Sequence, residues 1–311
     1  MIDQTQKKLL LALDGSEYAQ NAVKYVSELA PFQKMNVVLF NVFSNIPESY
    51  RDLEKDPQFS KAAREVMAWE MQQKKMITAS MDKAQQTLIR SGFPKKALTV
   101  KIQNRIKGIA RDIIYEAQNG YNAVVVGRKG MGTFQEVIVG SVAIKVVEKL
   151  AFLPILMIGQ MPADNKVLMA LDSSENAMQA VNFVADTLGG FDFKITLFHA
   201  IRGSQDFSTG IANLFLPKES SEEAEKTISD AFEQAKQRLI DKGFKPEQIT
   251  TKIVSGVSSR AGAVVEEARA GDYRTIVIGR RGLTKVQEFF MGRVSKKIIQ
   301  TIRNRAVWVV T

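Results

Sequence analysis

The chain has 311 residues with a formal net charge of +10, contains one histidine and no cysteine, and on its length is expected to form about two domains. The lack of cysteine excludes disulfides, thiolate metal sites and cysteine nucleophiles, and a single histidine leaves no cluster for zinc. No window reaches the ~18 apolar residues of a membrane helix, and an acidic residue interrupts the start of any signal peptide, so we expect a cytoplasmic protein without a membrane span.

The first half alternates apolar β-branched runs with amphipathic segments. A strand runs up to Asp14, and a polar turn and a helix follow it. The second strand covers 36–43. A long helix is expected from Asp56-Pro57, a typical N-terminal pair, to Gly92. The third strand (LTVKIQ), a short helix, the fourth strand (AVVVG), a helix over 141–150 and a fifth strand over 154–159 complete the series.

The second half repeats this series. KKLLLALDGSE and NKVLMALDSSE open the two halves, so Asp14 and Asp172 are equivalent. Strands over 194–201 and 306–311 and helices over 222–241 and 293–303 match those of the first half. The segment 159–165 is predicted to be a linker. We therefore expect an α/β protein of two domains, 1–160 and 161–311, each a doubly wound five-stranded parallel sheet.

A glycine motif follows the fourth strand of each half. Gly127, Gly130 and Gly140 have the spacing G-x2-G-x9-G, and Gly279, Gly282 and Gly292 repeat it. A strand that runs into a glycine loop and then a helix lets backbone N–H groups approach an anion closely. The pattern predicts a nucleotide-phosphate site, present twice, although shared ancestry alone would also repeat the glycines.

Asp14 is expected beside this loop. In a sheet of strand order 3-2-1-4-5, the ends of strands one and four are neighbours at the switch point, where ligands bind. Asp14 would there accept hydrogen bonds from ribose hydroxyls or hold an ion; the alternative is a helix cap. Gly140 and Ser141 would either bind phosphate oxygens or only permit a turn. The Walker A loop and the dinucleotide fingerprint are both absent. His199, near the end of a strand, is interpreted as structural.

These residues resemble the universal stress protein family, over nearly the whole chain and as a tandem member. Its ATP-binding branch has G-x2-G-x9-G followed by Ser or Thr after strand four, and an Asp after strand one. The first half matches in full. The resemblance implies a Rossmann-like, adenine nucleotide alpha hydrolase-like fold of strand order 3-2-1-4-5 and a regulatory, ATP-binding role in the stress response with little or no hydrolysis.

The resemblance also implies roles for individual residues. The backbone of Val42 should meet adenine, and Asp14 should lie near the ribose. The phosphates should be surrounded by Gly127, Arg128, Gly130, Gly140 and Ser141. Magnesium often accompanies the triphosphate, but no dedicated metal ligand or catalytic residue is evident. The second site would consist of Asp172, Gly279, Gly282 and Gly292, with Arg293 in place of the Ser or Thr, so whether it binds nucleotide is left open.

Partners and alternatives complete the expectations. The resemblance implies pairing through the fifth strands, within the chain or in a homodimer, and a protein partner that the sequence does not identify. One alternative is a slow ATPase or another nucleotide-dependent enzyme of related fold. The other is a polyanion-binding scaffold that uses the basic run Lys95–Arg111, although no aromatic residues interleave it, so we expect no nucleic-acid partner.

Overall fold

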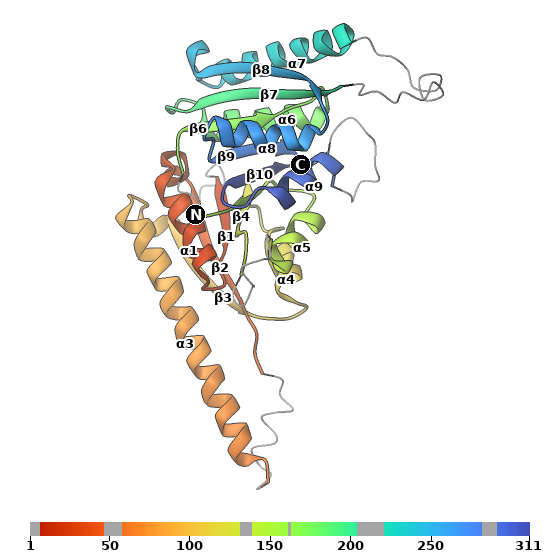
Figure 1. Ribbon diagram of the computed structural model, residues 1–311. Coiled ribbons are helices and arrows are strands. Elements are labelled where there is room, and N and C mark those ends of the chain that lie inside the picture. Colours follow the sequence, from red (N-terminus) through yellow and green to blue (C-terminus); the bar gives the residue numbers. More distant parts are fainter. Residues whose placement is uncertain (1–6, 47–57, 131–138, 161–162, 204–220, 282–290) are drawn as a thin grey trace, which may run out of the picture. The chain divides into compact units, whose positions relative to one another are not determined.

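A computed structural model describes residues 7–46, 58–130, 139–160, 163–203, 221–281 and 291–311. The chain divides into two compact units. The first comprises residues 1–28 and 32–150, and the second comprises 29–31 and 151–311. Figure 1 shows both units as strands covered by helices. Among the described residues, no helix is long and apolar enough to cross a membrane.

The elements of the first repeat follow the expected order. They are β1 (Lys8–Ala12), α1 (Glu17–Glu28), η1 (Ala30–Lys34), β2 (Asn36–Phe43), α3 (Ser60–Arg90), η3 (Lys95–Ala97), β3 (Leu98–Asn104), α4 (Ile109–Glu116), β4 (Ala123–Gly127), α5 (Ser141–Lys149) and β5 (Ile155–Ile158).

The long helix α3 begins at Ser60, and the predicted start at Asp56-Pro57 lies outside the described residues. Its end matches the prediction. Gly92 has φ +103°, which only glycine adopts readily, and the N–H of Phe93 donates to the carbonyl of Leu88 at 3.1 Å. The chain therefore turns sharply there and enters β3 through η3.

The strands of the first unit are parallel, in the order β3-β2-β1-β4. Leu11 lies in register with Leu39 of β2 and Val125 of β4, and all three are fully buried. The chain adds strands on one side of β1 and then returns to the other. Right-handed crossovers consequently place α1 and α3 on one face of the sheet and α4 and α5 on the other. Strand β1 and strand β4 form the switch point.

The second repeat has the same element order. It consists of β6 (Lys166–Ala170), α6 (Glu175–Leu188), β7 (Lys194–Arg202), α7 (Ser221–Asp241), η5 (Pro246–Gln248), β8 (Ile249–Val257), α8 (Arg260–Ala270), β9 (Thr275–Gly279), α9 (Arg293–Thr301) and β10 (Ala306–Val310). In the second unit β10 lies parallel to β9 on one side. On its other side β10 lies antiparallel to β5, with Trp308 opposite Leu156.

The predicted fold class is confirmed. Each repeat has the strand order 3-2-1-4-5 of a doubly wound α/β fold, with β5 and β10 as the fifth strands. The antiparallel pairing of β5 with β10 is the contact implied by the resemblance. It gives each of these apolar strands a partner, so that neither is left as an open edge along the paired residues.

Candidate functional site

A cavity of about 390 Å³ opens in the first unit where β1, β2 and β4 end. Parallel strands have their carboxyl ends at one edge of the sheet, so the segments that follow them meet there. Six of the seven residues expected in the first site line this cavity: Asp14, Val42, Gly127, Gly130, Gly140 and Ser141.

Asp14 faces the glycine loop, as its place after β1 predicts. Its Oδ1 accepts a hydrogen bond from the N–H of Ser16 at 3.0 Å. The cap of α1 is instead Ser16, whose Oγ accepts from the N–H of Ala19. A Cβ on Gly130 would lie 2.5 Å from Oδ2 of Asp14. Glycine at 130 therefore leaves room for this carboxylate beside the loop.

The other two glycines have different structural roles. A Cβ on Gly127 would lie 2.9 Å from the carbonyl carbon and oxygen of Tyr18, so glycine lets the first turn of α1 pack against the end of β4. The N–H of Gly140 donates to the carbonyl of Arg128 at 2.8 Å and closes the loop. Its Cβ would lie 3.3 Å from Cα of Lys129. The spacing thus reflects packing as well as access to a ligand.

The N-terminus of α5 supplies the donors of the cavity. Gly140 is its N-cap residue and makes no side-chain cap, and Ser141 is its first residue. The N–H of Ser141 and the positive end of the helix dipole favour an anion, whereas the N–H of Gly140 is bound to the carbonyl of Arg128. Lys129 also lines the cavity, with its Nζ 5.5 Å from the ring centroid of Tyr18. This part of the cavity therefore offers backbone donors and a cation, beside the carboxylate of Asp14.

Arg128, the seventh expected residue, does not line the cavity. Its side chain is fully buried, and burial lowers the pKa of its guanidinium to about 10. The group still carries its charge at neutral pH. Arg280, its counterpart in the second repeat, is buried to the same extent. Local sequence places Arg128 in the loop, but only the tertiary packing decides that its side chain turns inward.

Strand β2 forms a second wall, with Phe40, Asn41 and Val42. The Nδ2 of Asn41 donates to the carbonyl of Leu13 at 2.7 Å and ties β2 to the residue before Asp14. Its Oδ1 has no hydrogen-bond partner among the described residues, although the side chain is only 3% exposed. A buried amide oxygen of this kind is costly to leave unsatisfied and invites a donor from a ligand.

Helices α3 and α4 complete the cavity with residues that the sequence analysis did not assign to a site. Trp69, Gln73 and Ile77 come from α3, four residues apart and therefore on one face, and Ile109 and Ile113 come from α4. Trp69 is 54% exposed at this wall of the cavity. The sequence signal that could have assigned this helix face to a site is the polar Gln73, which stands between the apolar Trp69 and Ile77.

Comparison with known proteins decides the family. The model of the universal stress protein family matches residues 6–158 and again 165–310. The chain belongs to the universal stress protein family. Universal stress protein YxiE of Bacillus subtilis (strain 168) is 23% identical over 141 residues, which cover 44% of this chain and 92% of YxiE.

A solved structure of the same family shares the fold over almost the whole chain. A universal stress protein from Archaeoglobus fulgidus DSM 4304 matches with a TM-score of 0.59 and 17% identity, over 98% of both chains. The universal stress protein from Archaeoglobus fulgidus in complex with dAMP covers 48% of this chain and 98% of its own, with a TM-score of 0.35 and 16% identity.

The second repeat of this universal stress protein keeps most of the expected positions. Asp172 follows β6, and its Oδ1 accepts from the N–H and Oγ of Ser174. Gly279 ends β9, and the N–H of Gly292 donates to the carbonyl of Arg280 at 3.0 Å, as Gly140 does in the first repeat. Gly282 lies outside the described residues.

Arg293 is exposed at the start of α9, where the first repeat has Ser141. Its side chain makes no hydrogen bond or ion pair with any residue that the structure describes. A nearby hydroxyl is bound internally, since Oγ of Ser295 donates to the carbonyl of Gly279 at 2.8 Å. This end of α9 therefore presents a flexible cation in place of a small hydroxyl.

His199 has the structural role that was expected. It occupies the place of Asn41, and its Nδ1 lies 2.6 Å from the carbonyl of Leu171, the counterpart of Leu13. A carbonyl only accepts, so Nδ1 carries the proton and Nε2 is left as an acceptor. Burial lowers the pKa of the imidazole, more than this hydrogen bond raises it. The ring is therefore neutral at pH 7.

Two further features bear on alternative functions. Over the described ranges, no group of three or more His, Cys, Asp or Glu side chains is placed to hold a metal ion. In the basic run Lys95–Arg111, Nζ of Lys101 lies 2.6 Å from Oε2 of the buried Glu116. One charge of that run is thus neutralised within the fold, which weakens the run as a polyanion surface.

Proposed function

We propose that the chain is a regulatory protein of the cytoplasmic stress response that binds ATP in the cavity of the first unit and hydrolyses it slowly or not at all. The observation that carries the proposal is the convergence of Asp14, the glycine loop and the N-terminus of α5 on one cavity. The volume of this cavity, about 390 Å³, is within the usual range for pockets that bind small ligands.

The walls of the cavity match the parts of an adenine nucleotide. Phe40, Val42 and the isoleucines of α4 supply apolar surface for a base, and the unsatisfied Oδ1 of Asn41 would accept a hydrogen bond from its amino group. Asp14, as a carboxylate, accepts from ribose hydroxyls. The N–H groups of Gly130 and Ser141 and the hydroxyl of Ser141 donate to phosphate oxygens. The cavity thus offers apolar surface for a base and polar groups for the sugar and the phosphates, as such a ligand requires.

Slow turnover follows from the groups available. Phosphoryl transfer depends on a residue that orients the attacking water and on cations that neutralise charge developing on the transferred group. Among the described residues that line the cavity, Lys129 is the one cation. Asp14, beside the loop, is the one carboxylate among them. Magnesium would be held by the phosphates, since the cavity offers one carboxylate. We therefore propose that bound ATP changes the surface that the protein presents to a protein partner.

For the second repeat we propose weaker nucleotide binding or none. Asp172 and Gly279 keep their places, but Arg293 removes the hydroxyl of Ser141 from the start of the helix. An arginine there either extends over the phosphates or occupies their place. Because the two repeats differ at this position, their occupancy is expected to differ.

Measuring nucleotide in the purified protein tests the proposal. The protein, purified without added nucleotide, is denatured, and released nucleotide is quantified by chromatography and mass. Stripped protein is then titrated with Mg-ATP while tryptophan emission is recorded. Of the two tryptophans, Trp69 lines the cavity and Trp308 is fully buried, so quenching reports on the cavity.

Asp14→Ala is expected to weaken ATP binding by a factor of roughly 10 to 150, the loss of about 1.5–3 kcal/mol from hydrogen bonds to a charged group. Asp172→Ala removes the equivalent carboxylate of the second repeat and is the matched control, expected to leave the Trp69 signal intact. The proposal fails if no nucleotide is released and Mg-ATP leaves the emission of Trp69 unchanged.

A further inference from the structure

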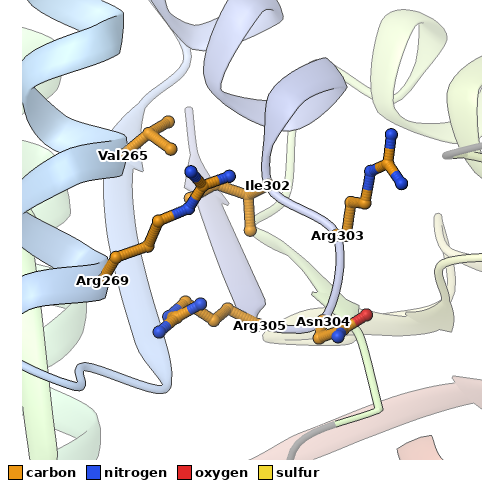
Figure 2. A pocket seen from close by; sticks show the side chains of 6 residues that line it. All are labelled: Val265, Arg269, Ile302, Arg303, Asn304 and Arg305. Carbon is orange, nitrogen blue, oxygen red and sulfur yellow. The ribbon is translucent and has the colours of Figure 1, made fainter.

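A small cavity of about 190 Å³ in the second unit has three arginines among its six lining residues. It lies between the C-terminal end of α8 and the segment that leads from α9 into β10. Figure 2 shows Arg269 reaching out from α8 toward Ile302, with Arg305 on the same side and Arg303 pointing the other way across the segment. Val265 and Asn304 complete the lining.

This cavity is separate from the nucleotide-binding edge of the second unit. β9 and β10 are parallel, so their amino ends share one edge of the sheet. The residues just before them, 272–274 and 302–305, lie at that edge. The glycine loop after β9 lies at the carboxyl edge. The arginine cavity is therefore not part of the second nucleotide position.

The charges around the cavity do not balance. Arg305 is held in place, since its Nε donates to the carbonyl of Tyr273 at 2.7 Å and its Nη2 lies 3.8 Å from Oδ1 of Asp272. Asp272 is shared with Arg274, which lies 3.9 Å from its Oδ2. The side chain of Arg269 makes no hydrogen bond or ion pair with any described residue. The cavity thus places uncompensated positive charge next to a fixed guanidinium.

Arg303 adds to this excess. It too makes no hydrogen bond or ion pair with the described part of the chain, and it is exposed at the rim. Guanidinium groups repel one another, so placing Arg269 beside Arg305, with Arg303 at the rim, costs free energy unless an anion occupies the space. The cluster is easier to explain as a ligand site than as a contribution to stability.

The first repeat lacks this cluster. Arg269 stands two residues after Glu267, and Gln118 stands two residues after the equivalent Glu116. The segment Arg303-Asn304-Arg305 before β10 corresponds to Ala151-Phe152-Leu153 before β5. None of these four residues of the first repeat, Gln118 and 151–153, carries a charge. The cations are therefore not required by the shared fold and are peculiar to the second unit.

We propose that this cavity binds the phosphate or diphosphate group of a small anion, clamped between Arg269 and Arg305 with Arg303 and Asn304 at the rim. Planar guanidinium groups donate in pairs to phosphate oxygens, and a tetrahedral phosphate offers oxygens to several arginines at once. A carboxylate has two oxygens and one charge, so it matches this set of donors less well. The site is independent of ATP binding in the first unit.

Titration of the full-length protein with inorganic pyrophosphate and inorganic phosphate at 150 mM KCl tests the proposal. Arg269→Gln introduces the residue of the first repeat. Because Arg269 is exposed and its side chain makes no hydrogen bond or ion pair with a described residue, the fold should persist. The variant should lose one pyrophosphate site per chain or bind it about tenfold more weakly, the effect of losing hydrogen bonds to a charged group. Arg303→Ala should have a smaller effect in the same direction.

Arg111→Gln is the matched control, since it removes one exposed positive charge from α4 of the first unit. It should leave pyrophosphate binding within about twofold. A second measurement needs no variant: modification of arginines by phenylglyoxal, mapped by mass, should be slowed at Arg269 when pyrophosphate is present. The proposal is overturned if Arg269→Gln leaves binding unchanged, if Arg111→Gln weakens it equally, or if pyrophosphate does not protect Arg269.

Discussion

Gly127→Ala tests the structural reason for the first glycine of the motif. Gly127 does not adopt a positive φ, so alanine fits its backbone conformation and only space is at issue. The new Cβ would lie 2.9 Å from the carbonyl carbon and oxygen of Tyr18, whereas carbon atoms prefer about 3.5–4.0 Å. These are backbone atoms of the first turn of α1, so no side-chain rotation relieves the contact. Helix α1 must move away from β4.

Overpacking of this kind costs about 1–3 kcal/mol, and the reduced freedom of the unfolded chain returns about 0.4–1 kcal/mol. The net loss is therefore about 1–2 kcal/mol. For a unit of this size it lowers the midpoint of thermal unfolding by about 2–8 °C. The two units need not unfold together. Amide hydrogen exchange, followed by mass spectrometry in peptides from β1 and β4, measures the change in the affected unit.

Gly279→Ala is the internal comparison. At that position the nearest atoms, the carbonyl oxygen of Arg281 and the backbone of Asn176, would lie 3.2 and 3.3 Å from the Cβ. Small shifts relieve such contacts, so the cost should be below that of Gly127→Ala. Equal exchange rates for Gly127→Ala and the wild type, or a larger loss for Gly279→Ala, would refute the packing explanation and leave ligand access as the reason for the glycine.

Three more changes give distinct results. His199→Asn should remove a pH dependence of the second unit. Burial lowers the folded pKa of His199 below 6.5, so stability is lost as the pH falls from about 6.5 through that pKa, and denaturation of the variant should lack this loss. Glu116→Gln should destabilise the first unit by about 1–2 kcal/mol at pH 7. Burial alone would raise the pKa of Glu116, but hydrogen bonds, led by that of Lys101, lower it. The difference in unfolding free energy between variant and wild type should therefore vanish as the pH falls below about 4.5. Arg293→Ser restores the hydroxyl and should increase the ATP bound per chain, measured after denaturation.

Much of this fold could be predicted because its signals are local. Apolar β-branched runs and helical periodicity depend on residues within one or two turns, and they located β2 to the residue. The duplication made each signal appear twice. Asp14 and the glycine loop could be brought together from the strand order alone, since the carboxyl ends of β1 and β4 are neighbours at a switch point.

The tertiary structure decided which way side chains point and which distant residues come together. Arg128 and Lys129 are adjacent in the loop, yet Arg128 is fully buried and Lys129 lines the cavity, because the packing around each differs. Trp69 stands three residues after Val66 and six after Ala63, on the spacing of one helix face, but lies at a cavity wall. Arg269 and Arg305 are 36 residues apart and meet only because the segments before β9 and β10 share one edge of the sheet. Periodicity specifies which face of an element is apolar, whereas what that face meets depends on distant segments that only the folded chain brings together.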